Sequence, residues 1–355
     1  MSLLARAEDF ERLAIRWAAA PHDAGTPAQT IAAIAAFPEQ FAADRDRLPQ
    51  NDTDRAFALV YKASHILDDT VLDAESDQKA DELTCAAAGY LDEALRLDPR
   101  CFDALRIRHA LDNGSRDSMV GFLERRREEV RDACRAISEE AGVPVVDGQL
   151  SSSVYMRPYL RWEMNLANEQ LNCGRYRASL QVCERALALD APDAMGVRFV
   201  AAYDHVKLED EKGFAALAAR FPADAGSAWF MLSRCFLAYR ARRLDEAAEE
   251  LHRVVRAFPD AGGILTYQEE LPCGTFGHLD YVPGTFDELY VAVSEAAVIF
   301  DENCGDALSP LSDWVARDAM VQQAKETEDA SREEAARPGG ESGASSARGD
   351  GKGGE

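Results

Sequence analysis

Five polar side chains recur along one expected helix at spacings of four, four, three and four residues: Arg157, Arg161, Asn165, Asn168 and Asn172. These spacings place all five on one stripe of the helix. Asn carries a donor and an acceptor and suits a peptide backbone, whereas Arg suits a carboxylate or a phosphate. We predict a binding surface here. The same face could instead be turned to water or bridge adjacent helices, and the sequence leaves both readings open.

Two further arginines take comparable places on the next two helices of the same kind. The predicted ligand-binding set is therefore Arg161, Asn165, Asn168, Asn172, Arg198 and Arg234. A groove lined by these residues in an otherwise acidic chain would concentrate an acidic protein or peptide.

One local cluster could support catalysis or a metal ion, namely Cys273, His278 and Asp280 in a glycine-rich loop. A thiol, an imidazole and a carboxylate can form a nucleophilic or metal site, but polar loops also produce such clusters by chance. The chain has no His-Glu-x-x-His, no Cys-x-x-Cys and no phosphate-binding Gly-Lys-Ser/Thr loop. We therefore expect no catalytic residue, no bound metal and no cofactor.

The elements that position these residues are helical almost throughout, because strand-like alternation is missing. Helix pairs end at Pro192, Pro222 and Pro259, which lie 30 and 37 residues apart. These intervals bracket the repeat of about 34 residues expected for tetratricopeptide units. Small residues such as Ser179 stand where paired helices would cross. The predicted class is all-α: a tetratricopeptide-like helical repeat array, or α-solenoid, with irregular N-terminal helices and a disordered C-terminal tail.

The expected divisions are an N-terminal helical region over 1–84, the repeat domain over 85–323 and a disordered tail over 324–355. Asn51 is expected to cap one helix and Ser309 another, which runs to about residue 323. Thr285 and Glu288 have the spacing of a capping box for a helix to about residue 300. The tail lacks apolar periodicity and cannot repay the entropy cost of ordering.

Composition restricts the classes of partner. The chain has 39 Lys and Arg against 63 Asp and Glu among its 355 residues, and its net charge is −24. Such an excess of negative charge repels phosphate backbones and anionic membranes, so we expect no nucleic-acid or membrane partner. No signal peptide or transmembrane stretch is evident, and the eight cysteines are scattered. These features predict a cytoplasmic protein with reduced thiols; they leave its oligomeric state open.

Several motifs resemble bacterial tetratricopeptide-like chains related to the suppressor-of-tumorigenicity-seven family. In order they are Ala94-Leu-Arg-Leu-Asp-Pro-Arg-Cys-Phe-Asp-Ala104, Met156-Arg-Pro-Tyr-Leu-Arg161, Cys173-Gly-Arg-Tyr176, Ala186-Leu-Ala-Leu-Asp190 and Gly196-Val-Arg-Phe199. The resemblance covers roughly residues 85–315. The segment Asp190–Gly196 departs from the family's asparagine-rich pattern. The resemblance implies a helical interaction scaffold without assigned chemistry.

The function we expect is therefore non-catalytic binding of a protein or peptide in the concave groove of the array. Two alternatives stay open: an enzyme that uses the loop with Cys273, His278 and Asp280, and a purely structural, self-assembling repeat protein.

Overall fold

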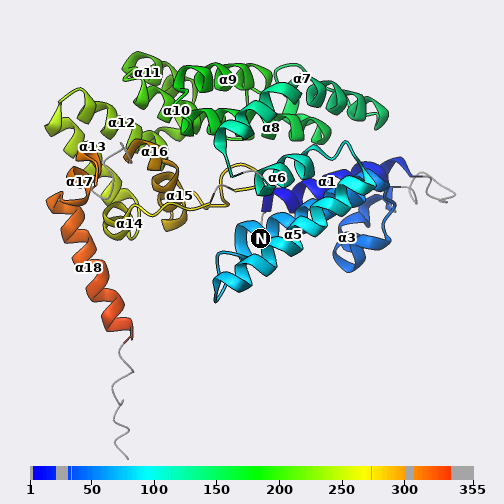
Figure 1. Cartoon of the computed structure of the whole chain (residues 1–355), viewed down its shortest axis with the longest axis horizontal. Coiled ribbons are helices and arrows are strands. Elements are labelled where there is room, and N and C mark those ends of the chain that lie inside the picture. Colours follow the sequence, from blue (N-terminus) through cyan, green and yellow to red (C-terminus); the bar gives the residue numbers. More distant parts are fainter. Residues whose placement is uncertain are drawn as a thin grey trace, which may run out of the picture.

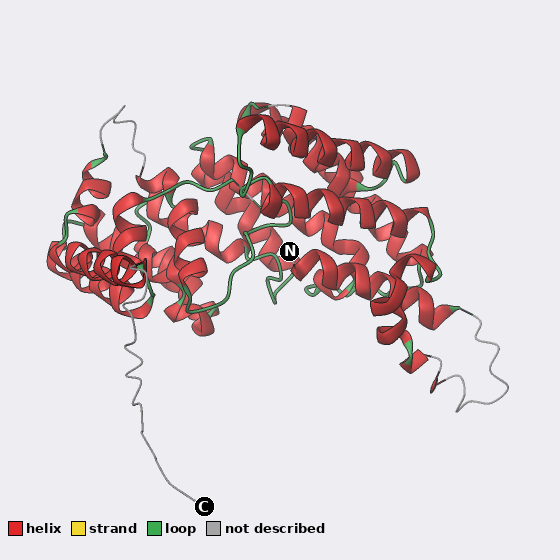
Figure 2. Ribbon diagram, turned by 90° about the horizontal axis from the view of Figure 1, so that it is seen from below, coloured by secondary structure: helices red, strands yellow, loops and turns green. Residues whose placement is uncertain are grey.

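The computed structural model describes residues 3–20, 31–32, 34–112, 114–272, 274–300 and 308–336, and the regular elements within these ranges are helices joined by loops. Within these ranges there is no β-strand, only an isolated bridge between Gln149 and Asp190. Figure 2 shows the helices and the loops that join them. The expected all-α class is confirmed. None of the described helices combines the length and the apolar character needed to cross a membrane.

The N-terminal helices lie on the right of Figure 1. They are α1 (Leu3–Ala19), α3 (Phe37–Asp44), α4 (Asp52–His65), α5 (Asp77–Leu97) and α6 (Phe102–Asp112), with a π-helical turn at Ile66–Thr70. Asn51 caps α4 as the sequence predicts. Its side chain accepts a hydrogen bond from the Asp54 N–H, and the Asp54 carboxylate accepts one from the Asn51 N–H. This exchange satisfies backbone donors that a helix start leaves without partners.

A row of helices runs along the top of Figure 1. It consists of α7 (Arg116–Glu140), α8 (Arg157–Asn172), α9 (Tyr176–Leu189), α10 (Val197–Lys207), α11 (Glu211–Arg220), α12 (Ala228–Arg240) and α13 (Leu244–Ala257). Helix α8 packs on α7 and α9, α10 packs on α9, α11 and α12, and α12 packs on α13. Ser179 is fully buried where α9 crosses α8, and its hydroxyl lies 2.9 Å from the Ala167 carbonyl oxygen. A small side chain allows this close approach, as expected.

The C-terminal helices turn below the other end of the row. They are α14 (Ala261–Tyr267), α15 (Phe286–Glu295), α16 (Ala297–Phe300), α17 (Pro310–Ala316) and α18 (Ala319–Ala336). Ser309 caps α17 and accepts from the Ser312 N–H at 3.1 Å. The single helix expected to follow Ser309 as far as residue 323 is wrong, because α17 ends at Ala316 and α18 begins at Ala319.

The capping box expected at the start of α15 is also wrong. The Thr285 hydroxyl donates to the Val282 carbonyl and makes no bond to the first turn of α15. Glu288 is buried and accepts from the N–H of Gly284 and, at 2.8 Å, from the N–H of Ala228 at the start of α12. The Glu288 carboxylate thus ties two helices together, because α12 offers it a backbone donor that local sequence cannot reveal.

Between α14 and α15 the described residues 268–272 and 274–285 are irregular, and we call them the irregular segment. Glycine and proline residues prevent a long helix there. Figure 1 shows it in yellow, running from the C-terminal helices to the neighbourhood of α6 and back to α15. Its tip reaches the N-terminal core, where the Phe276 ring packs with Phe57. This segment therefore joins the two ends of the molecule.

The apolar core does not divide where the sequence suggested. One cluster of buried side chains extends from Phe102 to Val321. A second cluster joins the N-terminal helices with Ile107 and Phe276. The boundary expected between residues 84 and 85 lies inside α5, an uninterrupted helix, so this division is wrong.

The expected tail contains ordered structure. Helix α18 continues to residue 336 and packs against α14, so the expectation of disorder is wrong for residues 324–336. The Glu328 carboxylate accepts from the N–H of Gly262 at 2.9 Å and of Gly263 at 2.8 Å. These N–H groups open α14, where backbone donors and the helix dipole favour an anion. Residues 337–355, the rest of the expected tail, lie outside the described residues.

Deleting residues 326–355 should therefore lower the melting temperature by at least about 3 °C, since it leaves two backbone donors of α14 without their carboxylate. Calorimetry or circular dichroism would measure the change. Deleting only residues 337–355 keeps α18 whole and serves as the control, for which we expect no shift. Equal melting temperatures for the two deletions would contradict a stabilising role for the contact between α18 and α14.

Candidate functional site

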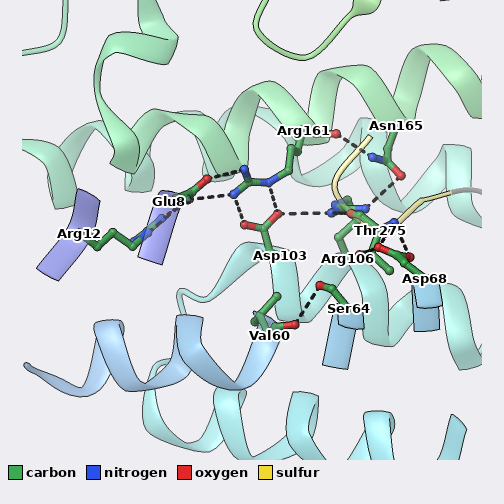
Figure 3. A network of polar contacts seen from close by, with 10 residues as sticks. All are labelled: Glu8, Arg12, Val60, Ser64, Asp68, Asp103, Arg106, Arg161, Asn165 and Thr275. Atoms are coloured by element: carbon green, nitrogen blue, oxygen red, sulfur yellow. Dashed lines mark hydrogen bonds and ion pairs between the residues drawn. The ribbon is translucent and has the colours of Figure 1, made fainter. Parts of the chain in front are cut away.

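Arg161, the first residue of the predicted ligand set, lies inside the protein. It is 2% exposed, and the expectation that it lines an open groove is wrong. Its guanidinium donates to Glu8 of α1 at 2.7 Å and to Asp103 of α6 at 2.8 Å. Figure 3 shows these bonds converging on Arg161 from two other helices. Arg161 therefore joins α1, α6 and α8.

The buried ion pairs around Arg161 form a continuous network. Arg12 donates to Glu8 at 2.8 Å, and Arg106 donates to Asp103 at 3.3 Å. Burial alone would raise the pKa of Glu8 and of Asp103, but the neighbouring guanidinium groups, Arg161 foremost, outweigh burial and hold both below their ordinary values. Both carboxylates are thus ionised and paired, which is the condition under which buried charges are tolerated.

The three asparagines of the stripe are half-buried and form what we call the amide face of α8. The Asn165 side chain donates to the Arg161 carbonyl at 2.9 Å and accepts from Arg106 at 3.1 Å. The Asn172 side chain donates to the Asn168 carbonyl at 2.9 Å. Asn168 and Asn172 also line a small cavity of about 30 Å³, which residues 270–272 and Gly274 line as well. The amide face therefore looks onto the chain's own irregular segment.

The other arginines of the stripe and set are engaged elsewhere. Arg157 donates to Glu11 and to the Ser151 carbonyl. Arg198 pairs with Asp193 and Asp224, while Arg234 pairs with Glu250.

Arg198 and Arg234 do meet at one place, the 3-10 turn Pro222–Gly226. Arg198 contacts Asp224 of this turn at 2.7 Å, and Arg234 donates to the Ala225 carbonyl at 2.7 Å. The six predicted residues are therefore divided among three surroundings: the buried network, the amide face and this turn. The single groove expected from the sequence is wrong.

The irregular segment enters the protein through a tight turn, Gly274–Gly277, that carries Thr275 and Phe276 at its tip. A Cβ atom on Gly274 would lie 2.8 Å from the Gly277 carbonyl oxygen, and Gly277 has φ +126°. Glycine is required at both places, because a side chain would clash at the first and be strained at the second.

Four residues hold this tip: Phe57, Asp68, Arg106 and Arg161. Together with Thr275 and Phe276 they form what we call the Thr-Phe clasp. Asp68 accepts from the Thr275 N–H at 3.0 Å and from its hydroxyl at 2.7 Å. Arg106 donates to the Thr275 carbonyl. The Phe276 ring meets the Phe57 ring edge-on, with centroids 6.0 Å apart, and its centroid lies 4.5 Å from the Arg161 guanidinium carbon. The clasp thus binds backbone, hydroxyl and ring together.

Asp68 reaches Thr275 from the π-helical turn at the end of α4. Such turns frequently mark functional positions, because they change the direction of one side chain relative to an α-helix. Burial raises the pKa of Asp68 to about 6, although its bonds to Thr275 oppose the shift. Sequence reasoning missed Asp68 and Arg106. The sequence does contain one indication of the bound turn: Gly274 and Gly277 flank Thr275 and Phe276 in a segment that lacks helical periodicity.

The proposed chemical cluster is not assembled among the described residues, and Cys273 lies outside them. His278 faces Glu295 with its Nδ1 and the Gly196 carbonyl with its Nε2, at 3.2 Å. Burial would lower the pKa of His278, but the Glu295 carboxylate outweighs burial and raises it. Both ring nitrogens are therefore occupied, and the partner carboxylate is Glu295 instead of Asp280.

Asp280 lines a cavity of about 220 Å³ on one side of the segment, together with Asp68, Asp69 and Asp287. In the part of the chain that the structure describes, no group of three or more His, Cys, Asp or Glu side chains could hold a metal ion.

Comparison of this chain with protein-family models, with curated proteins and with solved structures found no match.

Proposed function

We propose that this protein is a non-catalytic interaction scaffold that binds a protein or peptide on the amide face of a tetratricopeptide-like helical array. The pairs α8–α9, α10–α11 and α12–α13, each joined by a short turn, support the repeat reading. Stacked helix pairs of this kind offer an extended surface for a partner. Kinship with the suppressor-of-tumorigenicity-seven family and a cytoplasmic location belong to the same proposal.

The observation that carries the proposal is that helices α4, α6 and α8 already hold a non-helical stretch of polypeptide. The side chains of Asp68 and Arg106 engage the backbone N–H and carbonyl of one residue, Thr275. Asn168 and Asn172 border the neighbouring part of the segment with amide groups that can donate and accept. A surface that binds one loop in this way has the chemistry to bind another.

The enzyme alternative receives no support from His278, since Glu295 and Gly196 occupy its two ring nitrogens. A general base needs a free acceptor within reach of the proton that it removes. The structural alternative does have an observation in its favour, the burial of Arg161, and the experiment below separates it from binding.

A photo-crosslinking amino acid at Asn172 should capture a partner, whereas the same group at the exposed Gln181 of α9 should not. The partner, once identified and purified, should bind the double variant Asn168→Ala, Asn172→Ala at least about tenfold more weakly than the wild-type chain, because its polar groups lose their bonds in a partly desolvated site. Gln181→Ala is the control for affinity. Equal crosslinking at both positions, or unchanged affinity for the double variant, would contradict the proposal.

A further inference from the structure

The Thr-Phe clasp contacts only a few groups of the turn that it binds. It uses the N–H, hydroxyl and carbonyl of Thr275 and the ring of Phe276. Only two side chains of the bound turn are therefore recognised, and the rest of the recognition is made by backbone groups that every residue carries. Another loop with a hydroxyl residue followed by an aromatic residue could make the same contacts.

The two arginines of the clasp have further partners outside the bound turn. Arg161 is fixed by Glu8 and Asp103, and Arg106 is fixed by Asp103 and Asn165. These bonds come from α1, α6 and α8 and do not involve the turn, so its departure would not break them. A site whose groups keep their orientation when empty loses little entropy on binding again.

The chain's own turn fills its surroundings incompletely. The cavity of about 220 Å³ lies along Phe276 and Leu279, and the cavity of about 30 Å³ lies along Pro272 and Gly274. The Nε atom of Arg106 is buried and has no hydrogen-bond partner among the residues that the structure describes. The space on two sides and the unsatisfied donor indicate that the turn with Thr275 and Phe276 does not make every contact that this site could offer.

We propose that the Thr-Phe clasp is an exchangeable binding site whose partner presents a hydroxyl residue followed by an aromatic residue at the tip of a turn, in place of Thr275 and Phe276. This inference rests on the proposed scaffold function and specifies its ligand. The resting protein is occupied by its own turn, and a partner binds by displacing it. The aromatic ring then meets the Phe57 ring edge-on and lies under the Arg161 guanidinium, a position favoured by the cation–π attraction.

The test uses the full chain and a labelled synthetic peptide of residues 271–281 carrying Cys273→Ser. Phe276→Ala in the protein empties the ring position, so this variant should bind the peptide at least about tenfold more tightly than the wild-type chain, measured by fluorescence anisotropy. The matched peptide with Phe276→Ala should not bind. Adding Asp68→Ala to the protein variant should weaken peptide binding by about tenfold, because the acceptor for Thr275 is removed.

If Phe276→Ala does not fold, Thr275→Val takes its place, since it keeps the ring and the backbone bonds and removes the hydroxyl bond to Asp68. It should bind the peptide more tightly than the wild-type chain does. A folded variant that fails to bind the peptide would overturn the inference and make the clasp a permanent tie. The partner crosslinked through Asn172 would then still bind the wild-type chain if the scaffold proposal holds, so the two failures are distinguishable.

Discussion

Replacing Arg161 by methionine should lower the free energy of unfolding by about 3–5 kcal/mol, because it leaves two buried carboxylates without their shared partner. Glu8 and Asp103 are each less than 5% exposed, and both accept from Arg161. Arg12 and Arg106 would still neutralise part of their charge. Removing one member of a buried network is costly even where the intact network contributes little net stability.

Urea denaturation monitored by circular dichroism would measure this loss. Arg131→Met is the control, since Arg131 also pairs with two acidic residues but lies at the surface of α7. Exposed pairs contribute little to stability, so this variant should unfold at the same urea concentration as the wild-type protein. Adding Glu8→Gln to Arg161→Met should recover part of the lost stability. If both arginine variants have the same midpoint, the network does not hold α1 and α6 to α8.

Replacing Asp204 by asparagine should raise the free energy of unfolding at pH 8 by on the order of 1–3 kcal/mol. Asp204 is fully buried, and burial raises its pKa from 3.8 to about 8, although bonds from Ser179 and Cys183 oppose the shift. Ser179 lies 2.6 Å from Asp204 and 2.9 Å from the Ala167 carbonyl oxygen. The single Ser179 proton can serve only one of these oxygens, and when it goes to the carbonyl, which can only accept, a protonated Asp204 can donate to Ser179 instead.

The sign of the pH dependence follows from this shift. Below about pH 4 the Asp204 carboxyl is protonated in both states, and it costs no stability. Between about pH 4 and pH 8 the native state holds a proton that the unfolded state has released. The contribution of Asp204 to stability therefore falls as the pH rises through this range. Asparagine does not titrate, so Asp204→Asn removes this decline.

Unfolding free energies at pH 5, 6.5 and 8 would reveal the effect as a difference between the two proteins that grows with pH. Groups that titrate in both proteins cancel in this difference. Asp132→Asn, a change at an exposed position of α7, should give a curve parallel to that of the wild-type protein. A curve for Asp204→Asn that also runs parallel would show that the native state holds an ionised carboxylate at Asp204.

Several helix ends could be predicted from the sequence because the interactions that form them are local. Asn51 caps α4 through Asp54, three residues away, and Ser309 caps α17 in the same manner. Ser179 stands as expected where α9 crosses α8. Each depends on side-chain type and short spacing, which a sequence states directly.

Whether the polar stripe on α8 is buried or exposed could not be predicted in the same way. Helical spacing correctly puts Arg161 and the asparagines on one face, but it carries no information about what covers that face. Glu8 lies 153 residues from Arg161 along the chain, and Asp103 lies 58 residues away. The turn that carries Thr275 and Phe276 comes from a third part of the sequence, on the other side of Arg161 from Glu8 and Asp103. An amphipathic pattern separates buried from exposed positions only on average. In the sequence, an arginine that is buried with two carboxylate partners cannot be told from an exposed arginine.

Thr285 and Glu288 show how tertiary contacts overrule a local motif. Their spacing matches a capping box, yet the Glu288 carboxylate bonds to the Ala228 N–H at the start of α12. The residues 324–336 show the same effect, since their composition favours disorder and the N-terminus of α14 provides donors for Glu328. The sequence by itself determined the helical class, the ends of several helices and the residues that share a face. The tertiary structure alone decided which of those faces are buried, because the partners that desolvate and neutralise a side chain come from parts of the chain whose distance no periodicity encodes.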